Sequence, residues 1–117
     1  MDARQRGKWG EEIAAEYLQK KNYRVVARGW RSRFGEIDLI VADREYLAFV
    51  EVKLRKNANF AYAREYVGKE KQRKIRATAS LWLSSNSTRL QPRFDVIEVY
   101  VKDEAAAPEI IHIENAF

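Results

Sequence analysis

Cysteine is absent from this chain of 117 residues, and histidine occurs only once. The lack of cysteine excludes disulfide frameworks, thiolate zinc sites and cysteine nucleophiles. The single histidine, His112, also excludes any mechanism or metal site that needs two histidines. If the protein is a catalyst, it therefore has to use carboxylates and lysine, with or without a metal ion.

Long apolar runs are absent as well. No stretch approaches the ~18 apolar residues of a membrane span, and the N-terminal MDARQRGKWGEE lacks the apolar segment of a signal peptide. Neither an internal repeat nor a Pro/Gly/Ser-rich linker divides the sequence. We therefore expect a soluble, cytoplasmic protein with a single domain, residues 1–117, and no membrane partner.

Basic residues outnumber acidic ones. Lys and Arg total 22 against 17 Asp and Glu, and the sequence pI is about 9.6. On a domain this small, such an excess favours a polyanionic partner such as nucleic acid. Surface lysines also keep proteins soluble, so the charge alone leaves the partner open.

The spacing of apolar residues predicts two helices and five strands. A first helix is expected from about Arg4 to Lys21, where Asn22 would end it, and a second from about Lys69 to Ser84. Alternating segments predict strands over residues 23–27, 35–42, 46–54, 93–101 and 109–113. The order α-β-β-β-α-β-β implies an α/β fold with a central mixed β-sheet flanked by helices.

Two neighbouring strands carry acids inside otherwise apolar segments. In the strand 46–54, Glu51 and Lys53 share one face. In the strand 35–42, alternation separates Asp38 from an apolar row formed by Ile37, Leu39 and Val41. A tight turn should pair these strands antiparallel, which would put Asp38 and Glu51 on the same side with Cβ atoms about 5 Å apart.

Two carboxylates at that separation repel each other, and a divalent cation removes the conflict by binding both. Mg²⁺, or Mn²⁺ in its place, suits such hard oxygen ligands better than zinc does. Lys53 could then stabilise the extra negative charge of an in-line phosphoryl transition state. Taken alone, an E-x-K pattern on a strand is more often a structural ion pair. Glu11, at the edge of the apolar arc of the first helix, can either reach the sheet or remain solvated.

The run G-E-I-D-L-I, followed by F-V-E-V-K-L-R and preceded by G-K-W-G-E, resembles the PD-(D/E)XK nuclease superfamily. Within it, the chain most resembles the small bacterial YraN family, which is related to archaeal Holliday junction resolvases. The resemblance extends to K-Q-R-K-I, R-F-D-V-I and the terminal N-A-F. It implies a restriction endonuclease-like fold, metal coordination by Asp38 and Glu51, an accessory ligand in Glu11 and a catalytic Lys53.

Basic residues flank the acidic strands. Phosphate binding without sequence readout is predicted for residues expected in loops and in the second helix: Arg31, Arg33, Arg55, Lys56 and Lys71. Gln72 is expected to point toward the sheet, where a glutamine or lysine lines the site in related nucleases.

Aromatic residues divide into two groups. Trp30 and Phe60, expected in loops, are candidates for stacking on bases, whereas Trp82 is expected in the core beside Ile75. Asp95 is interpreted as a structural partner for an arginine.

The sequence therefore favours a metal-dependent nuclease that acts on nucleic acid, with DNA in branched or structured form as the expected substrate. Two alternatives stay open, namely a nucleic-acid-binding module with a nuclease fold but no activity, and a structural charge pair in a domain of unrelated function. Junction resolvases act as dimers, so a homodimer is compatible with the resemblance, although no feature identifies an interface.

Overall fold

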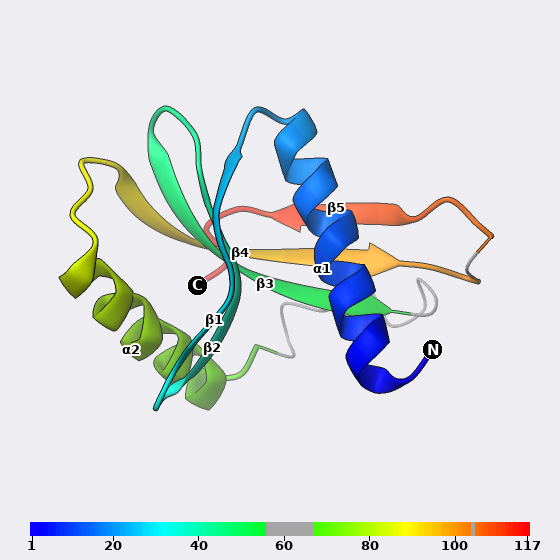
Figure 1. The fold of residues 1–117 in the computed structure, drawn as a ribbon, viewed down its shortest axis with the longest axis horizontal. Coiled ribbons are helices and arrows are strands. Elements are labelled where there is room, and N and C mark those ends of the chain that lie inside the picture. Colours follow the sequence, from blue (N-terminus) through cyan, green and yellow to red (C-terminus); the bar gives the residue numbers. More distant parts are fainter. Residues whose placement is uncertain (56–66, 104) are drawn as a thin grey trace.

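The computed structural model describes residues 1–55, 67–103 and 105–117 (Figure 1). Its helices and strands follow the predicted order α-β-β-β-α-β-β: α1 (Ala3–Lys20), β1 (Arg24–Ser32), β2 (Gly35–Ala42), β3 (Tyr46–Arg55), α2 (Lys69–Ser85), β4 (Gln91–Tyr100) and β5 (Glu109–Ile113). None of the helices in the described ranges combines the length and the apolar character needed to cross a membrane.

Both ends of α1 are specified by local sequence. Asp2 caps the first turn, where its Oδ1 accepts the N–H of Gln5 while the Gln5 side chain accepts the N–H of Asp2. Asn22 has a φ of +69°, and its N–H bonds the carbonyl of Gln19 while that of Tyr23 bonds Leu18. This is the Schellman arrangement, in which asparagine tolerates the left-handed conformation. The predicted stop at Asn22 is confirmed.

The five strands form one mixed sheet in the order β1-β2-β3-β4-β5. Neighbouring strands are antiparallel except β3 and β4, which run parallel because the chain crosses over through α2. Between β2 and β3 the ladder runs from Ala42–Leu47 to Leu39–Val50. This α/β architecture is the one expected of a restriction endonuclease-like fold.

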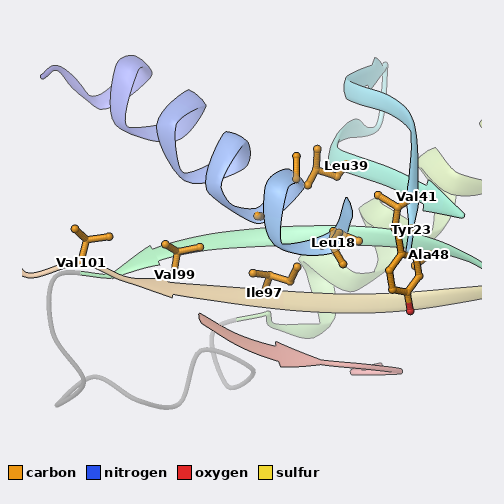
Figure 2. Close-up of a cluster of buried hydrophobic side chains, with 11 residues drawn as sticks. Leu18, Tyr23, Leu39, Val41, Ala48, Ile97, Val99 and Val101 are labelled. Carbon is orange, nitrogen blue, oxygen red and sulfur yellow. The ribbon is translucent and has the colours of Figure 1, made fainter. Parts of the chain in front are cut away.

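Two hydrophobic clusters lie on opposite faces of the sheet, one under each helix. Figure 2 shows the first, where Leu18 of α1 packs near Leu39, Val41 and Ile97. The second gathers Phe49 of β3 against Trp82 and Ile75 of α2, as predicted for both α2 residues. Alternation along β3 therefore sends Ala48 and Val50 toward α1, and Phe49 toward α2.

The first strand is longer than the sequence predicts, because β1 continues through Trp30 and Arg31 to Ser32. The expectation that Trp30 and Arg31 lie in a loop is wrong. The strand passes through Gly29, whose φ is +54°, and Trp30 pairs with Ile37 of β2. Trp30 packs against the second cluster, so pairing and burial outweigh the local turn signal.

Strict alternation also fails at Ile37, which was predicted to lie with Leu39 and Val41. Ile37 belongs instead to the second cluster, on the α2 side. The β2–β3 ladder ends at Leu39, and from there the β1–β2 hairpin twists toward α2 (Figure 1). A hydroxyl contact of 3.0 Å between Ser32 and Thr78 joins the end of this hairpin to α2.

A buried charge network anchors the start of β4. Arg93 donates from Nε and Nη2 to the two oxygens of Asp95, each at 2.8 Å, and from Nη2 to the Tyr23 hydroxyl at 2.6 Å. His112 of β5 lies 2.8 Å from Asp95, which also accepts the N–H of Asn115. The prediction that Asp95 pairs with an arginine is confirmed.

This network predicts a loss of stability in acid. Burial alone would raise the pKa of Asp95, but the hydrogen bonds from His112, Arg93 and Asn115 outweigh it and hold the pKa below its ordinary value. The stabilisation is therefore complete above the unfolded-state pKa of about 3.9 and is lost as the pH falls through the lower folded-state pKa. Urea unfolding from pH 6 to pH 2 measures it. The decline should be shallower in Asp95→Asn, and equal slopes in both proteins would contradict the prediction.

Candidate active site

Asp38 lies where β2 separates from β3. Continuing the ladder by one pair would place Asp38 opposite Glu51, but the regular pairing ends at Leu39–Val50. Asp38 Oδ2 instead accepts the backbone N–H of Val52 at 2.8 Å. The Asp38 carboxylate thus accepts the kind of hydrogen bond that a backbone carbonyl accepts in a regular ladder. This bond holds the Asp38 side chain against β3 beyond the point where the two strands separate.

Glu51 is the most enclosed acid of this region, with 6% of its surface exposed. Two ammonium groups approach the same oxygen, Oε1, with Lys71 Nζ of α2 at 2.6 Å and Lys53 Nζ of β3 at 3.4 Å. A buried carboxylate is costly unless it is paired, and here one oxygen is paired twice. The structural ion pair that the E-x-K pattern allowed is therefore present, and Lys71 joins it from another element.

Burial and neighbouring acids raise the pKa values of Asp38 and Glu11. Burial, followed by the charge of Glu51, raises the pKa of Asp38 to about 7, against the opposing effect of the Val52 hydrogen bond. Burial also raises the pKa of Glu11, with added repulsion from Glu36 and Glu51. Glu11 of α1 is thus close enough to acids on β2 and β3 for their charges to raise its pKa. Of the two positions predicted for Glu11, near the sheet or in solvent, this favours the one near the sheet.

The two lysines respond in opposite directions. Burial and the neighbouring Lys71 lower the pKa of Lys53, although Glu51 acts against them. For Lys71, the effect of burial is outweighed by its hydrogen bond with Glu51 and by that carboxylate's charge, so its pKa is raised. Lys71 therefore provides the stronger counter-charge to Glu51, while Lys53 is a partly desolvated ammonium group beside it.

A cleft of about 490 Å³ opens between α1 and the β1–β2 hairpin, beside Glu11 and Glu36. Basic side chains line it together with these acids: Arg4, Lys8, Arg28 and Arg31. Arg28 pairs with Glu12 at 2.7 Å and Arg31 with Glu36 at 3.4 Å, both at exposed positions. An acidic group with basic side chains around it can bind a cation and a polyanion side by side.

The other residues predicted to bind phosphate do not lie together in the structure. Arg33 lies in the turn after β1 and stacks over the Phe34 ring, and Arg55 is the last residue of β3 rather than a loop residue. The expected loop position of Arg55 is wrong because the parallel pairing with β4 continues to Tyr100. Gln72 donates to the carbonyl of Val67 at 2.7 Å, at the entry to α2. Lys56 and Phe60 lie outside the described residues.

The donors fit a hard divalent cation by their chemistry. Asp38, Glu51 and Glu11 offer carboxylate oxygens, and part of the rise in the pKa values of Asp38 and Glu11 comes from mutual repulsion that a cation relieves. Across the described residues, however, no three His, Cys, Asp or Glu side chains are arranged as a metal-binding group. In this conformation Lys53 and Lys71 neutralise Glu51 instead.

Sequence reasoning missed two features of the site. The first is Glu36, which lies two positions before Asp38 and for which no role was predicted. Its charge contributes to raising the pKa of Glu11. The second is the contact of Lys71 with Glu51, which joins residues on α2 and β3 that are twenty positions apart. The two-residue spacing of Glu36 and Asp38 on one strand could have indicated the role of Glu36, whereas no local pattern indicated the contact of Lys71.

Comparison with known proteins gives a consistent result. Residues 10–99 match the model of "Uncharacterised protein family UPF0102". A UPF0102 protein of Caldanaerobacter subterraneus subsp. tengcongensis is 45% identical, over 95% of this chain and 93% of its own length. A UPF0102 protein of Clostridioides difficile is 39% identical over the full length of both chains, and one of Rhodococcus opacus is 40% identical over 95% and 94%.

Proposed function

The chain belongs to the uncharacterised protein family UPF0102, which is the YraN family that its motifs resemble, and we propose that it is a metal-dependent nuclease hydrolysing nucleic-acid phosphodiesters. One observation carries the proposal. Buried Glu51 lies in contact with Lys53 and Lys71, while Asp38 and Glu11 raise the negative charge around it. Carboxylates that can hold a metal ion, beside an ammonium group that can stabilise transition-state charge, are suited to phosphodiester hydrolysis.

In this mechanism Asp38 and Glu51 would hold Mg²⁺ or Mn²⁺, and Glu11 would assist from α1. The ion would supply a Lewis acid and a water of lowered pKa. Lys53, fixed on β3 and largely enclosed, places its ammonium group where it can stabilise the negative charge of the in-line transition state. The basic side chains of the cleft beside Glu11 bind phosphates along the strand without reading bases.

DNA is the proposed substrate, in branched or otherwise structured form. The support is the similarity of the GEIDLI and FVEVK motifs to those of junction resolvases. A junction has to be cut twice, once by each subunit of a dimer. We therefore include a homodimer in this proposal only if the substrate is a junction. The excess of basic residues supports binding to any nucleic acid and does not separate DNA from RNA.

A substrate panel tests the proposal. Wild type is expected to cut at least one of branched, single-stranded or duplex DNA, or RNA, in the presence of Mg²⁺ or Mn²⁺, and to lose cleavage when EDTA is added. Asp38→Ala should lose the same cleavage, since it removes a proposed cation ligand. Cleavage that persists unchanged in Asp38→Ala would refute the assignment, and comparison of melting temperatures checks that the variant is folded.

A second candidate is a nucleic-acid-binding module without cleavage. The neutralisation of Glu51 by two lysines favours it, because the site is electrostatically satisfied without a metal. Such a module would bind nucleic acid in a salt-sensitive manner that survives Asp38→Ala, and would give no metal-dependent product on any substrate of the panel.

A further inference from the structure

Lys71 occupies Oε1 of Glu51, one of the two oxygens through which this carboxylate would bind the proposed cation. Its Nζ is 2.6 Å from Oε1, closer than Lys53 at 3.4 Å. A Mg²⁺ ion binds carboxylate oxygen at about 2.0–2.1 Å. An ammonium group on the same oxygen would lie only about 4 Å from such an ion, where the two positive charges repel, so each weakens the binding of the other.

The two lysines differ in their freedom to leave. Lys53 emerges from the middle of the sheet, and only 18% of its side chain is exposed. Lys71 lies in the first turn of α2 and reaches Glu51 with a side chain that is 44% exposed. Its flexible stem can turn the ammonium group into water at little cost, because nearly half of the side chain is already exposed. Lys71 is therefore the group that can be displaced.

We infer that Lys71 exchanges partners, holding Glu51 in the metal-free protein and moving to a phosphate of the nucleic acid when a divalent cation takes its place. This inference rests on the proposed function, and it assigns Lys71 a role in coupling the binding of the divalent cation to the binding of the nucleic acid. A phosphate that attracts Lys71 frees Glu51 for the cation, and the cation frees Lys71 for the phosphate. The two ligands then bind cooperatively, and each must strengthen the other by the same factor.

Titration of the protein with Mn²⁺ in a calorimeter tests the exchange without relying on catalysis. Lys71→Met should bind Mn²⁺ about tenfold more tightly than wild type, within the usual range of such coupling, because the competing ammonium group is gone. Lys69→Met is the matched control, since it removes the same charge from an exposed position on another side of α2. It should change the affinity by less than about twofold, as screened charges at a distance do. Glu51→Gln should abolish the binding.

A second measurement follows the amine itself. Mn²⁺ should increase the labelling of Lys71 by an amine-reactive reagent, as read by peptide mass spectrometry, while labelling of Lys69 stays constant. Equal Mn²⁺ affinities in wild type and Lys71→Met, both abolished by Glu51→Gln, would overturn the exchange and leave the proposed metal site intact. Absence of Glu51-dependent Mn²⁺ binding in all the proteins would overturn the metal-dependent function together with the inference.

Discussion

Replacing Lys53 with methionine is expected to reduce metal-dependent cleavage by about 10²–10³-fold, the usual cost of removing one group that stabilises transition-state charge. The loss should appear in kcat with little change in KM, because Lys53 is enclosed on β3 and would act on charge that develops during reaction. Methionine keeps most of the aliphatic volume, so packing against β3 should be preserved. Single-turnover cleavage of the preferred substrate measures the effect.

The control for this variant is Lys102→Met. Lys102 is exposed after β4 and has no place in the proposed site, so the variant should cut at the wild-type rate. A rate for Lys53→Met within about threefold of wild type, which is under about 1 kcal/mol of transition-state stabilisation, would remove Lys53 from the mechanism. An equal loss in both lysine variants would assign the effect to overall charge rather than to the site.

Replacing Asp95 with alanine is expected to lower the free energy of unfolding by about 3–5 kcal/mol, the cost of leaving a buried charge without its partner. Arg93 would keep the Tyr23 hydroxyl but lose both hydrogen bonds to the carboxylate. His112 and the N–H of Asn115 would lose an acceptor as well. Against a typical total of about 5–15 kcal/mol this is a large fraction, and urea unfolding at pH 7 measures it.

Glu114→Gln is the matched control, because Glu114 meets Arg93 only at 3.5 Å from an exposed position. Arg93 is buried, but the Glu114 end of this long contact is open to solvent, which screens the attraction, so the variant should unfold within about 1 kcal/mol of wild type. A cost below about 1 kcal/mol for Asp95→Ala would show that Arg93 finds other partners and that the network does not anchor the start of β4.

Most of the fold was predictable because its elements have strong local signals. Strands β2 and β5 begin and end where alternation predicts, and the end of α1 follows from the left-handed asparagine at position 22. Prediction failed for β1, which was expected to end at Ala27 but pairs with β2 as far as Ser32. Local propensity is a weak guide where a partner strand supplies both hydrogen bonds and burial.

The candidate site was predictable in part. Period-2 alternation put Glu51 and Lys53 side by side, and their ion pair is present. The same rule misplaced Ile37, because the hairpin twists away once the β2–β3 ladder ends. That twist leaves Asp38 bonded to the Val52 N–H instead of lying in a regular pair with Glu51.

The sequence by itself determined the order of the elements, the apolar faces and the acidic and basic residues from which a site can be built, because these depend on periodicities of two and 3.6 residues along the chain. Only the tertiary structure decided the charge balance of that site. Lys71 reaches Glu51 from α2, and the charge of Glu51 contributes to raising the pKa of Glu11 on α1. The strength of such contacts depends on burial and on distances across the fold, which no local pattern records.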